Sequence, residues 1–498
     1  MYYQKELAKL IKSSCSLIYV VTSEEERLEY ILKDITSRDV CQSIQVWNFV
    51  DGYEKSLNNQ DKAARNPFEA LNIIESYNSN SDVIFVLRDF HMFLNDNIIA
   101  RKIRNLSRKL DVCNQAIIIS ALELKIPTSL KYLCTVFILP LPNQYEIKLE
   151  IMRLFSLLPQ TPDLSWINQL ISISQGLSII QIRMIFSKMV VEKQHFSIAD
   201  YQLFVHEKQE QLKTTNGFLE LYLNNTSLNE IGGIDILKDW LLMRANSFSK
   251  ISMNYGLPYP KGILLIGIQG TGKSITARSI SNVFNLPLLK LDIGKIFGGI
   301  VGESETNIRE VIKISEASAP CVLWIDEIDK AFNRQPNTSD GGTTSRVLGT
   351  FLTWLADKHT PVFVVATANN ITHLPSEIIR KGRFDEIFFI GLPSIKERNM
   401  IFQVHLKNLR PKTWHRYNTE CLAKYSHLFS GAEIKQVIIE AMHHAFSKNQ
   451  EFSSNDILNA IEQMIPLAFT DQANISQIQL WVSLGKSRLA SKYYDLNI

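Results

Sequence analysis

Gly262-Ile-Leu-Leu-Ile-Gly-Ile-Gln-Gly-Thr-Gly-Lys-Ser274 is the stretch that decides the fold of the second half of this chain. Its apolar run, Ile263 to Ile266, is typical of a strand buried on both faces of a parallel sheet. Gly267, Gly270 and Gly272 allow a tight turn whose N–H groups point into a phosphate-sized hollow. A helix expected over 275–284 would present its positive end to the same anion. The spacing Gly-x-x-x-x-Gly-Lys-Ser therefore predicts a nucleoside triphosphate site.

The residues of this loop have expected roles. Lys273 is predicted to reach the β- and γ-phosphates, and the Ser274 hydroxyl is predicted to hold Mg²⁺. Contacts with the nucleotide are expected along the whole loop: Gly267, Ile268, Gln269, Gly270, Thr271, Gly272, Lys273, Ser274 and Ile275.

An acidic pair follows a second apolar run. Cys321 to Ile325 is expected to form a strand, and Asp326 and Glu327 come directly after it. A phosphate loop needs one carboxylate on a neighbouring strand to complete the Mg²⁺ site and a general base to orient water. Asp326 is predicted to hold the metal through its water shell, and Glu327 to polarise the attacking water. The alternative is that the pair caps a helix beginning at Glu327.

Polar and basic residues follow a third buried strand, expected over 362–367. Asn369 is predicted to help place the attacking water, the alternative being a residue that only turns the chain. Arg380 and Arg383 are predicted to lie on one side of a helical turn, so that both reach one anion. Such an arginine can accelerate phosphoryl transfer ~10³ to 10⁵-fold. Solvated surface arginines are the alternative, and the spacing does not assign either side chain to its own subunit's nucleotide.

Length and composition set the class of protein. A chain of 498 residues is long enough for about three domains. Its 45% hydrophobic and 21% charged residues are ordinary for a soluble globular protein. The net charge of +3 gives no argument for nucleic acid or a membrane surface. No cysteine lies in a Cys-x-x-Cys or zinc-ligand spacing, no apolar run approaches a membrane span, and Met1 to Glu6 resembles neither a signal peptide nor a transit peptide.

The first half of the chain also alternates strands and helices. Strands are expected over 17–21, 82–87, 116–120 and 136–139, and helices over 24–35, 99–110 and from residue 144, the first of them capped by Ser23. This order predicts a parallel sheet covered by helices. Where a phosphate loop would lie, however, Glu24, Glu25 and Glu26 would repel a triphosphate.

An internal repeat links the two halves. The run 137–142, which ends in Pro142 before a helix, parallels the run 389–393, which ends in Pro393 before a helix. The segment around Gly176 parallels the segment around Gly431. The first half is therefore predicted to be a degenerate copy of the second, the alternative being an unrelated α/β domain with a coincident pattern.

Over residues 228 to about 463 these motifs resemble the AAA family of ATPases. The resemblance implies an α/β P-loop fold, with a parallel sheet flanked by helices and a small helical lid, preceded here by the α/β module without a phosphate loop. It implies ATP and Mg²⁺ as cofactors, Ile231 and Gly232 near adenine, Asn369 as a sensor, Arg380 and Arg383 as fingers on the neighbouring subunit, and Gly431 and Ala432 as lid contacts. The expected domains are 1–196 (degenerate AAA-like module), 197–227 (helical linker), 228–393 (large nucleotide-binding subdomain), 394–465 (lid) and 466–498 (tail).

The resemblance extends to assembly and location. It implies a homo-oligomeric ring, hexameric in the family, that hydrolyses ATP to remodel a protein partner. The whole chain is most similar to AAA proteins encoded in red-algal plastid genomes and in cyanobacteria, which predicts the chloroplast stroma. One departure concerns threading of a substrate, because Ile300, preceded by Phe297, stands where ring translocases carry an aromatic pore residue.

Three other functions are weighed against this one. A nucleotide-dependent regulatory or scaffold protein with little turnover is the main alternative. A membrane-bound protease lacks its zinc site, since His206-Glu207 is followed by Glu210 where a histidine would be needed. Nucleic-acid binding through the basic residues of 101–109 is disfavoured, because Lys and Arg normally cover the solvated face of an amphipathic helix. No membrane insertion is expected.

Overall fold

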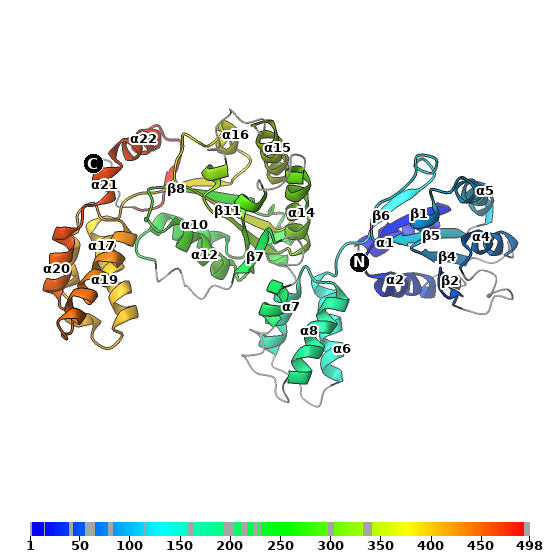
Figure 1. Ribbon diagram of the computed structural model, residues 1–498, viewed down its shortest axis with the longest axis horizontal. Helices are drawn as coiled ribbons and strands as arrows, with labels where there is room; N and C mark the ends of the chain where they lie inside the picture. Colours follow the sequence, from blue (N-terminus) through cyan, green and yellow to red (C-terminus); the bar gives the residue numbers. More distant parts are fainter. Residues whose placement is uncertain are drawn as a thin grey trace. The chain divides into compact units, whose positions relative to one another are not determined.

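The computed structural model describes residues 2–13, 15–38, 43–54, 65–77, 83–113, 115–157, 164–192, 204–210, 217–222, 228, 231–296, 303–331 and 341–492. The chain forms two compact units. The first comprises Met1–Leu154 and Leu177–Ser187, and the second comprises Phe155–Gly176 and Lys188–Ile498. The described residues build one β-sheet in each unit (Figure 1). Within the described ranges, no helix has the length and apolar character needed to span a bilayer.

The first unit is a six-stranded sheet with helices on both faces. Its strand order is β3-β2-β4-β5-β1-β6, and all neighbours are parallel except β2 and β3. The elements are α1 (Tyr2–Lys12), β1 (Leu17–Val21), α2 (Glu25–Arg38), β2 (Ser43–Asn48), β3 (Gly52–Tyr53), α4 (Pro67–Ser76), β4 (Val83–Arg88), the 3-10 helix η1 (Phe90–Phe93), α5 (Asn97–Cys113), β5 (Ala116–Ala121), β6 (Thr135–Ile138), α6 (Gln144–Ser156) and α8 (Ile179–Glu192).

The apolar runs of the first unit are buried on both faces because successive side chains of a strand point to opposite sides. Leu17 and Tyr19 of β1 pack in one hydrophobic cluster with residues of α4 and α5. Ile18 and Val20 pack in a second cluster with residues of α1 and α2. The expected strands are thus correct to within a residue or two.

The start of α2 differs from the prediction. The helix begins at Glu25, one residue later than expected, so Ser23 does not directly precede it. The hydroxyl of Thr22 accepts a hydrogen bond from the Glu24 backbone N–H at 2.9 Å instead. This side-chain contact closes the turn between β1 and α2.

The second unit contains a seven-stranded sheet. Its order is β13-β12-β8-β11-β10-β9-β7, parallel except for the pair β7 and β9. The elements are α7 (Leu164–Ser174), β7 (Leu219–Tyr222), α10 (Asp235–Arg244), α11 (Lys250–Tyr255), β8 (Gly262–Gly267), α12 (Lys273–Phe284), β9 (Leu288–Leu291), α13 (Ile293–Ile296), α14 (Glu303–Ala317), β10 (Cys321–Ile325), η3 (Ile328–Ala331), α15 (Gly341–Asp357), β11 (Val362–Ala368), α16 (Ser376–Ile379), β12 (Glu386–Ile390), α17 (Ile395–Leu409), η4 (Trp414–Arg416), α18 (Thr419–Tyr425), α19 (Gly431–Ser447), α20 (Ser454–Gln463), α21 (Leu467–Thr470), α22 (Gln472–Ser483) and β13 (Arg488–Leu489).

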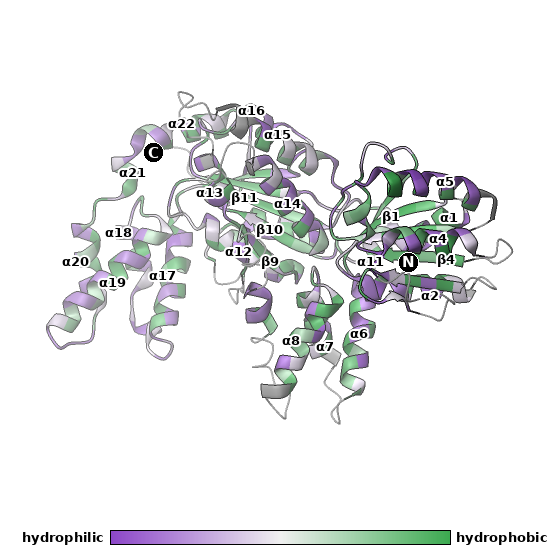
Figure 2. Cartoon of the chain, turned by 45° about the vertical axis from the view of Figure 1, so that its right-hand side comes forward, coloured by the Kyte–Doolittle hydropathy of each residue, from purple (hydrophilic) through white to green (hydrophobic). Residues whose placement is uncertain are grey.

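The core of the second unit lies around its central strands, which Figure 2 shows as hydrophobic segments between helices with polar outer faces. Ile263, Val322 and Phe363 belong to a cluster that also contains residues of α10 and α12. Strand β7 falls in the segment 197–227, which was expected to be a helical linker. That expectation was wrong for residues 219–222, because they pair with β9 and extend the sheet.

The lid and the tail complete this unit. Helices α17 to α20 enclose their own apolar cluster, which includes Phe402, Leu422 and Ile438, and Figure 1 shows α17, α19 and α20 side by side. The tail contributes α21, α22 and β13, and β13 pairs in parallel with β12. The carbonyl of Ala490 accepts the N–H groups of Ile236 and Leu237 in the first turn of α10. The tail therefore belongs to the second unit's core structure.

The two sheets share one topology and one register. Five parallel strands follow in the order β2-β4-β5-β1-β6 in the first sheet and β9-β10-β11-β8-β12 in the second, so β1 corresponds to β8. Val21 is level with Ala121 and Ile138 in the first sheet. Ile266 is level with Ala368 and Phe389 in the second. Matching Val21 to Ile266 therefore fixes the other equivalences. The shared topology and register agree with the predicted internal copy, which stays a prediction.

The predicted register of the repeat needs one correction. Ser178 caps α8 by accepting the Gln181 N–H, and Gln181 in turn accepts the Ser178 N–H. Ser430 and Glu433 form the same reciprocal cap on α19. Ser178 is thus the equivalent of Ser430, and pairing Gly176 with Gly431 was wrong by three positions.

Candidate nucleotide-binding site

The phosphate loop lies between β8 and α12, as the sequence predicts. The helix begins at Lys273, two residues earlier than expected, so the loop proper is 268–272. Gly272 has a φ of 96°, a left-handed conformation that favours glycine. At Gly267 a Cβ atom would lie 2.1 Å from the Ile390 carbonyl oxygen, which no other residue tolerates. These two glycines let the loop turn tightly next to β12.

A cavity of about 460 Å³ opens over this loop. It is lined by Ile231, Gly232, Gln269, Gly270, Thr271, Gly272, Lys273, Ser274, Ile275, Glu327, Thr367, Asn369, Ile401, Val404, His405, Gly431, Ala432 and Lys435. The structure thus gathers most of the predicted residues around one hollow between the sheet and the lid. Gly267, Ile268, Asp326, Arg380 and Arg383 are not among the described lining residues.

Lys273 is buried at the centre of the loop. Its ammonium donates to the carbonyl oxygens of Gly267 at 2.9 Å and Ile268 at 2.7 Å. Burial lowers the pKa of Lys273 to about 8, although the nearby carboxylates of Asp329, Asp326 and Glu327 oppose this change. Phosphate oxygens would supply the negative charge that favours the ammonium form.

Gly267 and Ile268 serve the site through their backbones. Their carbonyl oxygens hold the Lys273 ammonium, whereas the Ile268 side chain is buried on the other side, in a cluster with Leu392, Ala468 and Ile475. The last two residues come from α21 and α22. The phosphate loop therefore rests on the tail.

A candidate metal position lies next to the loop. The Ser274 hydroxyl donates to Asp326 Oδ1 at 3.1 Å, and the Thr367 hydroxyl donates to the same oxygen at 2.6 Å. The described residues contain no cluster of three or more His, Cys, Asp or Glu side chains that would enclose a metal. One hydroxyl and one carboxylate nevertheless fit Mg²⁺, which usually keeps several waters and binds one or two protein oxygens together with substrate phosphates.

Glu327 and Asn369 meet at the mouth of the cavity. Glu327 Oε1 accepts a hydrogen bond from Asn369 Nδ2 at 3.0 Å. The Glu327 N–H donates to the Thr367 hydroxyl at 2.9 Å, and the residue has a φ of 51°. Glu327 also directly precedes η3, which begins at Ile328, and its carbonyl oxygen accepts the Lys330 N–H at 2.9 Å, so the acidic pair stands at the start of a short 3-10 helix as well. The left-handed backbone places this carboxylate within hydrogen-bonding distance of Asn369.

A buried acid supports the Asn369 segment. Asp329 Oδ2 accepts the backbone N–H groups of Asn369 at 3.2 Å and Asn370 at 2.9 Å. The side chain is 4% exposed, and its Oδ1 atom has no hydrogen-bond partner in the described structure. Asp329 thus fixes the turn that carries Asn369.

The arginine geometry differs from the prediction. Helix α16 ends at Ile379, and Arg380 has an extended backbone. Gly382 has a φ of 95°, and Arg383 donates to the Glu377 carbonyl oxygen. The expectation that Arg380 and Arg383 share a helical turn was therefore wrong, since the chain leaves the helix before both. Arg380 is exposed.

Several lining residues were not predicted. Thr367 joins Asp326 to Glu327 through its hydroxyl, and Ile401, Val404, His405 and Lys435 face the cavity from the lid. Burial, and then the nearby Lys435, lower the pKa of His405, so its imidazole is neutral at pH 7. Lys435 lies four positions after Gly431, so the two residues share one face of a helix. This spacing was the one local signal from which Lys435 could have been predicted as a lining residue.

The first unit holds a charge-inverted counterpart of this site. By the shared register, Arg88 at the end of β4 takes the position of Asp326, and Asp89 takes that of Glu327 with a matching φ of 53°. Glu25 opens α2 where Lys273 opens α12. Arg88 Nε lies 3.7 Å from Glu25 Oε2. Charges of opposite sign thus stand at the positions equivalent to Asp326 and Lys273.

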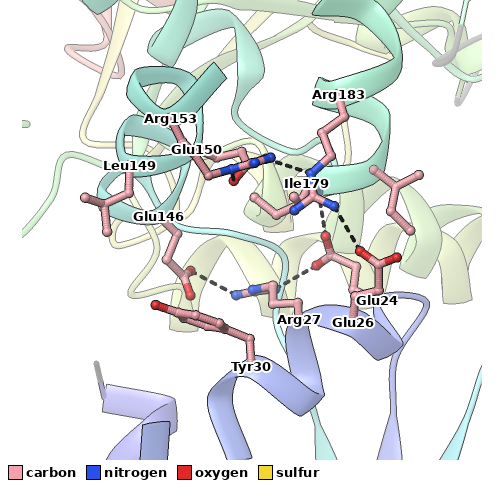
Figure 3. Close-up of a pocket in the computed structure, with 11 residues that line it drawn as sticks. Glu24, Glu26, Arg27, Tyr30, Glu146, Leu149, Glu150, Arg153, Ile179 and Arg183 are labelled. Carbon is pink, nitrogen blue, oxygen red and sulfur yellow. Dashed lines mark hydrogen bonds and ion pairs between the residues drawn. The ribbon is translucent and has the colours of Figure 1, made fainter. Parts of the chain in front are cut away.

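Ion pairs occupy the equivalent hollow of the first unit (Figure 3). Arg27 of α2 donates to Glu24 at 2.7 Å and to Glu146 of α6 at 2.9 Å. Arg183 of α8 donates to Glu150 at 2.6 Å. The remaining cavity measures about 430 Å³. Since the turn 22–24 is also two residues shorter than 268–272, this position is built for internal ion pairs and not for a triphosphate.

The glycine-rich phosphate loop, the acidic pair at the end of a neighbouring strand and the helical lid together define a P-loop nucleotide-binding protein. Two family models match the chain: the ATPase family associated with various cellular activities (AAA) over residues 263–392, and the N-terminal domain of SpoVK-like AAA ATPases over residues 3–139. The chain belongs to the AAA family of ATPases.

Similar proteins match either nearly the whole chain or about half of it. An uncharacterised AAA domain-containing protein ycf46 from Guillardia theta is 48% identical over 99% of this chain and 97% of its own length. The protein of the same name from Gracilaria tenuistipitata var. liui is 49% identical over 99% of this chain and 100% of its own length. A proteasome-activating nucleotidase from Saccharolobus solfataricus is 30% identical over 48% of this chain and 63% of its own length.

The predicted pore segment lies outside the described residues: it contains Phe297, Ile300 and their neighbours through Gly302.

Proposed function

We propose that the chain is a Mg²⁺-dependent ATPase that works as a ring on a protein partner. The observation that carries this proposal is the hydrogen bond between Glu327 and Asn369 at the mouth of the cavity that contains Lys273. A carboxylate held beside a phosphate-binding lysine is what activation of water for attack on a γ-phosphate requires.

Each residue of the site has a place in the proposed reaction. Lys273 leaves the Gly267 and Ile268 carbonyls and binds the β- and γ-phosphates. Ser274 and Asp326 would hold Mg²⁺, which would neutralise charge on the phosphate oxygens. Glu327 accepts the proton of the attacking water, and Asn369 fixes the orientation of that carboxylate. Ile231, Gly232, Gly431 and Ala432 enclose the base.

A neighbouring subunit supplies the missing positive charge. The described lining of the cavity includes lysines but no arginine, while Arg380 is exposed on the same unit. Arg380, with Arg383 beside it, therefore acts on the nucleotide of the next subunit in a hexameric ring. A head-to-tail contact of this kind closes into a ring when the rotation between subunits permits. The proposed location is the chloroplast stroma.

The proposal is tested by sedimentation velocity with and without ATP and Mg²⁺, alongside the ATPase rate across protein concentration. A ring that forms with ATP, and a specific rate that rises with concentration, are expected. A monomer with ATP bound and negligible turnover at every concentration would overturn the ring and favour a nucleotide-gated regulator.

A further inference from the structure

The turn that leads into β6 repeats the turn that leads into β12. In the first unit, the Leu130 N–H donates to the Pro127 carbonyl at 3.0 Å. In the second unit, the Ile378 N–H donates to the Pro375 carbonyl at the same distance. Leu130 is 1% exposed and Ile378 is 0% exposed, so each turn buries one aliphatic side chain three positions after its proline. The two turns therefore correspond residue by residue over this stretch.

Tyr132 stands where the second unit carries Arg380. It follows Leu130 by two positions, just as Arg380 follows Ile378. Its side chain is 98% exposed, the largest value among the large apolar side chains of the described residues. The preceding residue, Lys131, is exposed as well. A ring with so little cover from its own chain is available for contact with another molecule.

The ion-paired cavity of the first unit, here called the first-unit cavity, lies where the second unit has its nucleotide cavity. Helices α2, α6 and α8 line the first-unit cavity, and α12, α17 and α19 line the nucleotide cavity. Asn143 and Glu146 form a reciprocal cap on α6, as Ser394 and Glu397 do on α17. The proposed contact of Arg380 with a neighbour's nucleotide cavity thus has a counterpart in Tyr132 and the first-unit cavity.

The lining of the first-unit cavity suits an aromatic ring. Arg183 donates through Nε to Glu150 at 2.6 Å and through Nη1 to Glu26 at 2.9 Å (Figure 3). A guanidinium that carboxylates hold by its edge can stack its face on an aromatic ring, and Arg183 is 40% exposed. Leu149 and Ile180, which are half-exposed, add apolar contact at the same cavity.

Volume and charge favour the same occupant. The first-unit cavity measures about 430 Å³, within the roughly 300–1,000 Å³ of pockets that enclose small organic ligands. Its described lining carries four glutamates and three arginines, which leaves one negative charge in excess. That excess disfavours a triphosphate but suits Tyr132 with Lys131 beside it.

We propose that Tyr132 of one copy of this chain enters the first-unit cavity of the next copy. Its ring lies against Arg183 and Ile180, and its hydroxyl donates to Glu26. The contact is head-to-tail, because the two surfaces that meet are different patches of one chain. It rests on the proposed function, since the action of Arg380 on a neighbouring copy is its model. It lets the first unit, which has no phosphate loop, join copies without nucleotide.

Photochemical cross-linking of the purified full-length protein tests this contact. Azidophenylalanine, which is close to tyrosine in size, replaces Tyr132, and isotope-labelled and unlabelled chains are mixed so that cross-links between copies are recognised. We expect cross-links between copies from position 132 to the parts of α6 and α8 that line the first-unit cavity, with and without ATP. The control places the same group at Tyr255 of α11, which is 83% exposed and should not reach that cavity. Cross-links from position 132 within one chain only, to another surface only, or not at all would overturn the proposal.

Paired variants test whether Tyr132 and the first-unit cavity meet each other. Tyr132→Ala is expected to weaken self-association, measured by sedimentation velocity, at least about tenfold, with ATP binding unchanged. Tyr132→Phe keeps the ring and should retain most of the association. In an Ile180→Ala background the effect of Tyr132→Ala should shrink, because residues in contact are energetically coupled. An equal loss in both backgrounds, or no loss in either, would show that Tyr132 does not enter the cavity.

This contact and the proposed ATPase ring can fail separately. No cross-link from position 132, together with an ATPase rate that rises with protein concentration, would overturn the contact and leave the ring in place. Cross-links to the first-unit cavity, together with a rate that stays flat, would support the contact and overturn the action of Arg380 on a neighbouring copy.

Discussion

Asn369 Nδ2 donates to Glu327 Oε1 at 3.0 Å, across the ends of the neighbouring strands β11 and β10. The bond orients one carboxylate oxygen, and Lys330 pairs with the other at 2.6 Å.

Glu327→Gln keeps the side-chain shape but cannot take a proton. We expect ATP to remain bound while turnover falls by ~10² to 10⁴. Single-turnover hydrolysis and nucleotide-binding titrations measure the two effects, and a wild-type rate in this variant would remove Glu327 from the role of base.

Thr367 connects the metal carboxylate to the base. Its hydroxyl donates to Asp326 and accepts from the Glu327 N–H. Thr367→Val leaves that partly buried N–H without its partner, which costs about 1 kcal/mol of stability. It also frees Asp326, so the affinity for Mg²⁺ in the presence of ATP is expected to fall roughly 10–100-fold. Thr367→Ser, which keeps the hydroxyl, is the control and should restore most of the affinity.

The affinity for ATP should depend on pH through Lys273. The pKa of about 8 in the free protein means that the ammonium predominates below pH 8 and loses its proton above it. Phosphate binding raises this pKa, so binding above pH 8 takes up a proton. We expect constant affinity from about pH 7 to 8 and a loss of about tenfold per pH unit above that.

Calorimetric titration in buffers of different ionisation enthalpy measures this proton uptake. Lys273→Arg keeps its charge across the range, because a guanidinium does not titrate there. Its affinity for ATP should therefore stay flat above pH 8. A slope shared by the wild type and this variant would assign the pH dependence to another group.

Arg380 is expected to act in trans. Arg380→Ala should reduce ATP turnover by ~10³-fold or more, while the exposed neighbour change Lys381→Ala should not. Lys273→Ala should abolish nucleotide binding but leave Arg380 intact. Mixing these two inactive proteins places an intact Arg380 beside an intact pocket, so the ATPase rate should recover in part. A mixture no more active than its components would mean that Arg380 does not complete a neighbour's site.

Two residues of α22 allow the contribution of core packing to stability to be measured apart from that of an exposed side chain. Ile478 is 5% exposed against Phe389, and Leu480 is 65% exposed. Ile478→Ala should lower the free energy of unfolding of the second unit by about 2–5 kcal/mol. Leu480→Ala should change it by no more than about 0.5 kcal/mol. Thermal unfolding, monitored through hydrogen exchange of the β12 amides, distinguishes the two variants.

Continuous apolar runs made the sheets predictable. The five residues Leu17–Val21 and the run Cys321–Ile325 form strands with the expected bounds, because a strand buried on both faces needs no alternation. β7 and β13 were not recognised, since short edge strands carry exposed polar residues such as Glu220 and Arg488. Their pairing depends on strands distant in the chain.

The site was predictable where function lies in consecutive residues. The loop and the pair Asp326 and Glu327 follow directly from local spacing. His405 and Lys435 did not, because their approach to the cavity depends on how the lid folds back over the sheet. Arg383 was misplaced for a different reason: an i, i+3 spacing implies one face only inside a helix, and the chain leaves α16 at Ile379.

The parallel pairing of β13 with β12 has a consequence for synthesis on the ribosome. All six strands of the first sheet have been made once residue 138 is translated, so that sheet can close while the remainder of the chain is still being added. The second sheet needs residues 488–490, which also cap the first turn of α10, some 250 positions earlier. Its phosphate loop rests on the same late segment. Nascent chains should therefore gain a folded first unit well before they gain the capacity to bind ATP.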